Sequence, residues 1–291
     1  MTIKSIGVVG AGQMGLGIAQ VAAFHGYATT VVEVSEAQTK RAQAAIEKSL
    51  SRLVEKGKAT ADQKTQTISN LTWAKELSQL KSADLVIEAV PENAAIKEKV
   101  YKELCPYLKP NAILASNTSS NSITRLASHT DRPERFMGMH FMNPVPIMKL
   151  VEVIRGLATT DETVTEVLAV VEKMQKVSAV SNDFPGFIIN RILMPMINEA
   201  AYALYENIGT IEAIDTGMKL GTNQPMGPLE LADFIGLDTC YEIMNVLHKE
   251  LGDSKYRPCP LLVQYVDAGW HGCKSGKGFY DYNTTPPSPT R

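Results

Sequence analysis

One short glycine pattern near the start of the chain constrains its fold more than any other feature. Gly10-Ala11-Gly12-Gln13-Met14-Gly15 matches GxGxxG and lies between an apolar run, Ser5–Val9, and a segment expected to be helical, Gln13–His25. The first glycine permits a tight turn, the second lets a ligand approach the backbone, and the third lets helix and strand pack closely. The pattern predicts a dinucleotide-binding strand–turn–helix unit, with a glycine-rich packing turn as the alternative.

An acidic residue at a suggestive distance supports the first interpretation. Glu33 ends a second expected strand, Thr29–Val34, and follows the central glycine by 21 residues, as counted from Gly12. A carboxylate there accepts hydrogen bonds from the adenosine ribose hydroxyls and repels a 2′-phosphate. The pattern therefore favours NAD over NADP, although a solvated acid at the end of a strand is the alternative.

Strands and helices alternate through the first part of the chain and give way to helices alone. Further elements are expected at Glu36–Lys56, Asp84–Val90, Ala94–Leu104, Ile113–Ala115, Phe136–His140 and Leu150–Ile154. Continuous apolar strands separated by helices predict a doubly wound, mostly parallel, Rossmann-like sheet. After Asp183 the expected helices cover 187–205, 210–220, 227–235, 238–251 and 261–268. We therefore expect a Rossmann-like domain at 1–183 and an all-helical domain at 184–291, with a disordered tail at 284–291.

Composition excludes several classes of function. The 291 residues suffice for two domains, and the net charge of −2 does not point to nucleic acid or to an anionic membrane as a partner. No apolar run reaches the length that spans a bilayer. The four cysteines lie far apart without the spacing of metal ligands, which favours a reducing, cytoplasmic location and no metal site.

Two polar clusters near expected strand ends are candidates for the chemistry. Ala115–Ser120 directly follows one strand, and Gly138–Pro144 contains His140 and precedes the run that carries Glu152. A histidine exchanges protons near neutral pH, and a carboxylate can hold its ring. From the residues alone, a structural histidine is an equal alternative.

Five longer segments resemble the L-3-hydroxyacyl-CoA dehydrogenase family. They are SNTSS (116–120), MHFMNP (139–144), MKLVEVI (148–154), DFPGFIINRI (183–192) and PMGPLELADFIGLD (225–238). The similarity extends over nearly the whole chain and is strongest to short-chain members. It implies NAD-dependent interconversion of (S)-3-hydroxybutyryl-CoA and acetoacetyl-CoA, in butyrate or short-chain fatty acid metabolism, by a homodimer or higher oligomer.

The resemblance also implies roles for individual residues. His140 would be the general acid–base, Glu152 would support its charged form, and Ser119 and Asn190 would bind the substrate oxygens. The expected NAD contacts are Gly10, Gly12, Gln13, Met14, Gly15, Glu33, Glu92, Lys97, Ser119, Asn143 and Lys274. From the residues alone, Ser119 could be a turn hydroxyl, Asn190 a capping residue, and Glu92 and Lys97 a solvated acid and a surface lysine.

A basic stripe is the candidate site for coenzyme A. Lys48, Arg52 and Lys56 recur every four residues, so they share one helix face. Such a face suits the phosphates of coenzyme A, and the family resemblance adds Ser49 to the contacts. A solvated helix face is the alternative.

Two competing functions stay open at this stage. One is a dehydrogenase of free hydroxy acids, against which the basic stripe argues. The other is a non-enzymatic dinucleotide binder, as in a crystallin of a related family, against which His140 and Glu152 argue.

Overall fold

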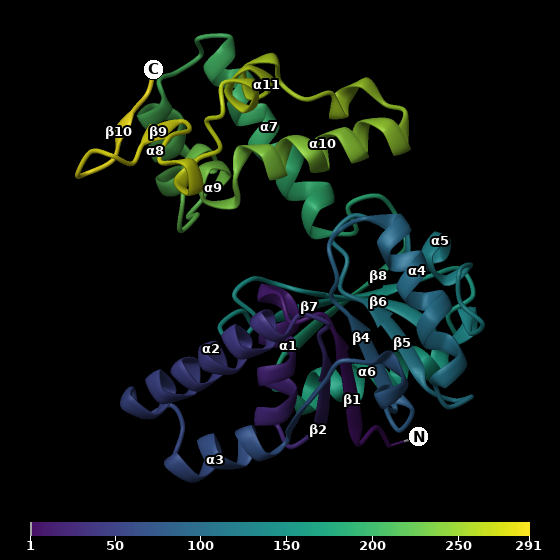
Figure 1. Cartoon of the computed structure of the whole chain (residues 1–291). Coiled ribbons are helices and arrows are strands. Elements are labelled where there is room, and N and C mark those ends of the chain that lie inside the picture. The colour runs from purple at the N-terminus through teal and green to yellow at the C-terminus, as the bar shows by residue number, and fades with distance from the viewer. Residues whose placement is uncertain (1) are drawn as a thin grey trace. The chain divides into compact units, whose positions relative to one another are not determined.

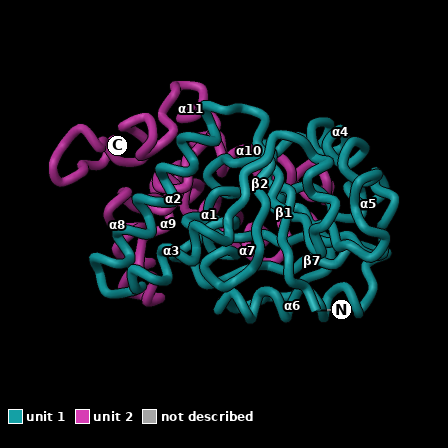
Figure 2. The backbone as a smooth tube through the Cα atoms, turned by 60° about the horizontal axis from the view of Figure 1, so that its bottom comes forward, with its two compact units in different colours: residues 1–184 teal, residues 185–291 magenta. Residues whose placement is uncertain are grey.

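The structure, a computed structural model, describes residues 2–291. The chain divides into two compact units, Met1–Phe184 and Pro185–Arg291 (Figure 2). The boundary expected after residue 183 differs from this division by one residue. Each unit has its own cluster of buried apolar side chains.

The first unit is built on one eight-stranded sheet (Figure 1). Its strands are β1 (Ser5–Val9), β2 (Ala28–Val32), β3 (Leu71–Ala74), β4 (Leu85–Glu88), β5 (Ile113–Ser116), β6 (Phe136–Phe141), β7 (Leu150–Arg155) and β8 (Val177–Asn182). The strand order is β3-β2-β1-β4-β5-β6-β7-β8, and all neighbours are parallel except β6 and β7. The first six positions have the order of dinucleotide-binding folds. The predicted doubly wound, mostly parallel sheet is confirmed.

Helices cover both faces of this sheet. They are α1 (Gln13–Phe24), α2 (Glu36–Glu55), α3 (Ala61–Ser69), α4 (Ala94–Leu104), α5 (Ile123–Ala127) and α6 (Asp161–Lys173). Apolar residues of α1 and α6 share one buried cluster with alternate residues of the central strands. On the opposite face, Tyr101 of α4 packs edge-on against Phe136 of β6. Ile123 of α5 lies there against Gly138, where a Cβ would come within 2.9 Å of it.

Five helices and strands of this unit were not predicted from the sequence, namely α3, β3, α5, α6 and β8. α3 and β3 are short, and α3 begins with a capping box in which Thr60 and Gln63 bond reciprocally. α6 begins at a Thr160 cap, and β8 forms the sheet edge with mostly exposed side chains. α3, β3 and β8 bury little apolar surface, so their hydrophobic periodicity is weak. α6 is different, because its buried Val164, Val167 and Val171 recur at helical spacing, a signal in the sequence that could have identified it.

The second unit is predominantly helical, as predicted. Its helices are α7 (Ile189–Tyr205), α8 (Ile211–Gly221), α9 (Pro228–Ile235), α10 (Leu237–Leu251) and α11 (Pro260–Asp267). One expectation is wrong: the tail is ordered, because β10 (Ser288–Pro289) pairs with β9 (Tyr280–Asp281). The N–H of Thr290 also donates to the carbonyl of Phe279 at 2.9 Å. The prolines of the tail therefore do not prevent it from folding back onto the unit.

Among residues 2–291, no helix has both the length and the apolar character that a bilayer crossing requires.

A carboxylate at the amino end of β4 anchors the first strand. Asp84 accepts hydrogen bonds from the N–H groups of Lys4 and Ser5 at 2.9 and 3.0 Å, and from Lys109 Nζ at 2.7 Å. Burial raises the pKa of Asp84, but the hydrogen bonds from Lys109, Lys4 and Ser5 outweigh burial and lower the pKa to about 2, from an ordinary 3.8. Asp84 therefore stabilises the fold in its ionised form.

We predict that Asp84→Asn lowers the free energy of unfolding of the first unit by about 2 kcal/mol at neutral pH. Because the folded pKa is depressed, this contribution is complete above pH 3.8 and is lost as the pH falls through about 2. Urea unfolding, followed by Trp73 fluorescence in a Trp270→Phe background, measures it.

The control is Asp62→Asn, which neutralises an exposed acid in the first turn of α3. Its effect should be within a few tenths of a kcal/mol. An Asp84→Asn protein as stable as the parent at neutral pH would contradict the proposed anchor.

Candidate active site

The turn between β1 and α1 has the geometry that its glycines predict. A Cβ on Gly15 would lie 2.0 Å from the carbonyl oxygen of Gly10, so helix and strand approach closely there. Gly10 has φ +97, and a Cβ on it would lie 2.9 Å from the carbonyl oxygen of Ala89. Gly12, in contrast, has nothing within 4 Å of its Cβ position. The turn is therefore closed against the protein and open at Gly12, the position where a pyrophosphate approaches.

The start of α1 is suited to an anion. In the first unit, α1 alone lacks a side-chain cap, and its first turn contains no acidic residue. The other five helices are capped by Ser35, Thr60, Asn93, Ser122 and Thr160. The unfilled cap leaves backbone N–H groups and the positive end of the helix dipole for a phosphate.

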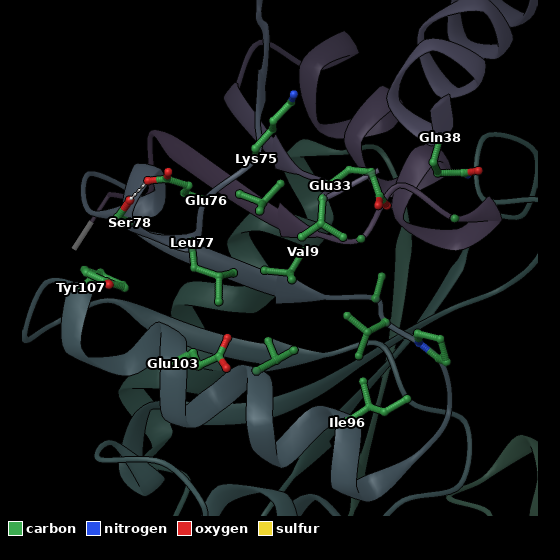
Figure 3. A pocket seen from close by; sticks show the side chains of 18 of the residues that line it. Val9, Glu33, Gln38, Lys75, Glu76, Leu77, Ser78, Ile96, Glu103 and Tyr107 are labelled. Carbon is green, nitrogen blue, oxygen red and sulfur yellow. Dashed lines mark hydrogen bonds between the residues drawn. The ribbon is translucent and has the colours of Figure 1, made fainter. Parts of the chain in front are cut away.

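A cavity of about 1200 Å³ extends from this turn along the ends of β1 and β2 (Figure 3). Glu33 lines it, and its two carboxylate oxygens accept the N–H groups of Ala11 at 3.0 Å and Ser35 at 2.9 Å. Each oxygen has a second lone pair for a ribose hydroxyl. The apolar lining includes Val9, Val32, Val34, Leu77, Ile96 and Val100. Donors, carboxylate and apolar walls together fit the adenosine and pyrophosphate of NAD.

Two further predicted cofactor residues meet in the structure. Gln13 lies on α1, and Asn143 lies in the loop that follows β6. Gln13 Nε2 donates a hydrogen bond to Asn143 Oδ1 at 3.0 Å. The glycine turn is thereby tied to the segment that carries His140.

His140 and Glu152 face each other across two neighbouring strands. The antiparallel register of β6 and β7 pairs these two residues directly. His140 Nδ1 lies 2.7 Å from Glu152 Oε2, and the Glu152 side chain is fully buried. Because a carboxylate accepts and does not donate, Nδ1 carries the proton of this hydrogen bond. The arrangement holds the imidazole in one orientation and suits it to proton transfer at Nε2.

The loop after β5 is held by Glu92. Glu92 Oε1 accepts the Ser119 N–H at 2.8 Å and the Thr118 hydroxyl, and Oε2 lies 3.3 Å from Lys97 Nζ. Burial raises the pKa of Glu92, but Lys97 and the hydrogen bonds from Thr118 and Ser119 outweigh burial and lower the pKa. The interpretation of Lys97 as a surface lysine is wrong, because its side chain is fully buried.

The basic stripe lies on the exposed face of α2. Lys48, Arg52 and Lys56 are exposed, and Ser49 beside them is half-buried. The buried residues of α2 are Ala42, Ile46 and Leu50. None of the three basic side chains is ion-paired within the described part of the chain. Three unpaired positive charges on one helix face suit a ligand that carries several phosphates.

Two predicted site residues belong to the second unit. Asn190 is buried near the start of α7. Lys274 Nζ lies 2.5 and 2.6 Å from the two carboxylate oxygens of Asp238. Burial raises the pKa of Asp238, but Lys274, the hydrogen bond from the Thr239 N–H and the charge of His271 together outweigh burial and lower the pKa. The roles of Asn190 and Lys274 stay predictions.

Three more residues organise this region: Glu88, which sequence reasoning missed, and Asn117 and Thr118, which belong to the candidate cluster 115–120 but were given no individual role. Glu88 is buried at the end of β4 and bonds Lys97, Asn117 Oδ1 accepts the Phe141 N–H at 2.9 Å, and Thr118 is fully buried. An acid inside an otherwise apolar strand is the signal that could have identified Glu88. Within residues 2–291, no group of three or more His, Cys, Asp and Glu side chains is arranged to hold a metal ion.

Comparisons with known proteins agree with the fold and with the dinucleotide site. Residues 5–184 match the family model of the 3-hydroxyacyl-CoA dehydrogenase NAD-binding domain, and residues 186–282 match that of the C-terminal domain. The 3-hydroxybutyryl-CoA dehydrogenase of Bradyrhizobium diazoefficiens is 58% identical over 99% of both chains. The protein of the same name from Clostridioides difficile is 45% identical over 96% of this chain and 99% of the relative.

A solved structure is also similar over its full length. The (S)-3-hydroxybutyryl-CoA dehydrogenase of Ralstonia eutropha is 47% identical, with a TM-score of 0.95 over 97% of this chain and 100% of that one. Both halves of the chain therefore match one family of enzymes in sequence, and the whole chain matches in structure. The chain belongs to the 3-hydroxyacyl-CoA dehydrogenase family and is an NAD-dependent dehydrogenase.

Proposed function

We propose that the protein interconverts (S)-3-hydroxybutyryl-CoA and acetoacetyl-CoA, with His140 as the general acid–base. The observation that carries the proposal is the direct pairing of His140 with the buried Glu152 at 2.7 Å. The similar proteins named above, which share 45% or more identity with this chain, support the choice of substrate.

The chemistry needs a hydride and a proton to move together. NAD accepts or supplies the hydride at C3 of the substrate. In the reductive direction His140 donates the proton from Nε2 to the oxygen at C3, and in the oxidative direction it takes that proton. Glu152 stabilises the charged imidazolium, and Ser119 and Asn190 bind the substrate oxygens. Fixed geometry of the acid–base group supplies much of the rate enhancement in such reactions.

The wider setting follows from the family resemblance. We propose that the protein acts in short-chain fatty acid metabolism such as butyrate formation, in the cytoplasm, as a homodimer or higher oligomer. The second unit would contribute to substrate binding and to the contact between subunits.

One assay separates this function from its two competitors. NADH oxidation is followed by absorbance with acetoacetyl-CoA, with acetoacetate and without substrate. Turnover of acetoacetyl-CoA alone supports the proposal. Equal turnover of acetoacetate would favour a free hydroxy acid dehydrogenase, and no turnover of either would favour a non-enzymatic binder.

We predict that His140→Ala lowers kcat by about 10²–10⁴-fold, because a positioned acid–base group is lost. NADH affinity should stay nearly unchanged, since the cavity beside Glu33 is untouched. Glu152→Gln should also lower kcat, and the double mutant should be little worse than the worse single mutant. Steady-state kinetics measures the cycle. Fully multiplicative losses would show that the two residues act independently.

We predict that Lys56→Ala raises KM for acetoacetyl-CoA more than KM for NADH. Loss of one charge-assisted phosphate contact costs up to about 2 kcal/mol, and added salt should mimic the effect in the parent. Lys4→Ala, which removes an exposed lysine that directly precedes β1 and is not on α2, is the control for net charge. An unchanged acyl-CoA KM in Lys56→Ala would make the stripe a solvated face.

We predict that NADH is used with a higher kcat/KM than NADPH, because the Glu33 carboxylate repels a 2′-phosphate. Glu33→Ala should narrow the difference between the two cofactors. Comparable kcat/KM values for both cofactors in the parent would contradict the role of Glu33.

A further inference from the structure

Lys97 on α4 is a fully buried cation between two acids. Its side chain is 0% exposed, Nζ donates to Glu88 Oε1 at 2.8 Å, and it lies 3.3 Å from Glu92 Oε2. An unpaired ammonium in such a place would cost several kcal/mol. The position of Lys97 therefore depends on these two carboxylates.

Glu88 is the fully buried member of the pair. Its Oε2 accepts the Tyr101 hydroxyl at 2.6 Å and the Ser116 hydroxyl at 2.8 Å. Its Oε1 accepts the Val90 N–H at 2.8 Å as well as Lys97. Burial and the negative charge of Glu88 raise the pKa of Tyr101, which keeps that hydroxyl a donor. All the acceptor sites of Glu88 are occupied, so it has none to offer to a ligand.

Glu92 connects this buried group to the loop that follows β5. Its Oε1 accepts the N–H groups of Ser119 and Ser120 at 2.8 and 3.1 Å, and the Thr118 hydroxyl. The shape of the 118–120 loop is thus set by Glu92, whose carboxylate faces Lys97.

The loop lies where the second half of a dinucleotide must bind. Glu33 fixes the adenosine half at the end of β2, so the rest of the molecule crosses toward the ends of β4, β5 and β6. The 118–120 loop follows β5, and Asn117 just before it accepts the N–H of Phe141, the neighbour of His140. The nicotinamide ring is therefore expected beside this loop.

We propose that Glu88 is a positioning residue that holds Lys97 and, through Lys97 and Glu92, the 118–120 loop in the shape that receives the nicotinamide half of NAD. The inference rests on the proposed function only in placing that half beside His140. Glu88 acts without contact with cofactor or substrate, because its side chain is enclosed by α4, β4 and β5.

The test compares two ligands that differ in the nicotinamide ring. Isothermal titration without substrate gives the Kd of NADH and of ADP-ribose for the parent and for Glu88→Gln. We expect Glu88→Gln to raise the Kd of NADH about tenfold. This is the lower end of the effect that residues supporting the ligands of metal sites have on affinity. The Kd of ADP-ribose should rise less than twofold, because the glycine turn and Glu33 are unchanged.

Three further single mutants and one double mutant keep the test decisive. Ser116→Ala removes one hydrogen bond to Glu88 and no charge, so it replaces Glu88→Gln in the test if that variant does not fold. It should also weaken the binding of NADH more than that of ADP-ribose, but by a smaller factor. Lys97→Met should match Glu88→Gln, and the double mutant should be no worse than either, since they act as one unit. The control Glu166→Gln breaks a different ion pair, to Arg135 at 2.7 Å, and should leave both Kd values unchanged.

If Glu88→Gln and Lys97→Met raise the Kd of NADH and the Kd of ADP-ribose by the same factor, the proposal is overturned. It is also overturned if neither Kd changes. A parent protein that binds NADH but does not reduce acetoacetyl-CoA would contradict the proposed function and leave this test intact.

Discussion

The reversal of strand direction between β6 and β7 is the constraint on which the candidate chemistry depends. Every neighbouring pair from β3 to β6 in the sheet is parallel, and β7 then runs against β6 with His140 opposite Glu152. Cross-strand partners in such a pair are the closest side-chain neighbours that a sheet offers. A shift of β7 by one residue against β6 would turn Glu152 to the face opposite His140. The register that stabilises the sheet therefore also aligns the acid with the histidine.

The parts of the fold that sequence could predict are those with strong local signals. Ala94–Leu104 was predicted as a helix and is α4, which begins at an Asn93 cap. Ser5–Val9 was predicted as a strand and is β1, whose apolar residues are nearly all buried. β8 was not predicted because four of its six residues are exposed at the sheet edge. There, pairing with β7 rather than hydrophobic pattern decides the conformation.

In the candidate site, too, some residues could be predicted from local sequence and others could not. The glycine turn and Glu33 could be predicted because spacing along the chain encodes their geometry. Glu88 had a signal of its own, as an acid within an apolar strand. Its pairing with Lys97 and Tyr101 could not be predicted, because only the packing of α4 on β4 and β5 makes a lysine an interior residue. The sequence around Lys97 is typical of a solvent-exposed helix position. In the folded chain Lys97 lies between the buried carboxylate of Glu88 and that of Glu92, which holds the 118–120 loop.

The central claim is that Glu152 stabilises the charged form of His140 during proton transfer. The pH dependence of kcat for acetoacetyl-CoA reduction, in the parent and in Glu152→Gln, tests it most directly. Reduction requires the imidazolium, so activity falls as the pH rises, and without the carboxylate the imidazolium is less stable. The account predicts that the alkaline limb of the profile moves to lower pH in Glu152→Gln. An alkaline limb at the same pH in both proteins would contradict it.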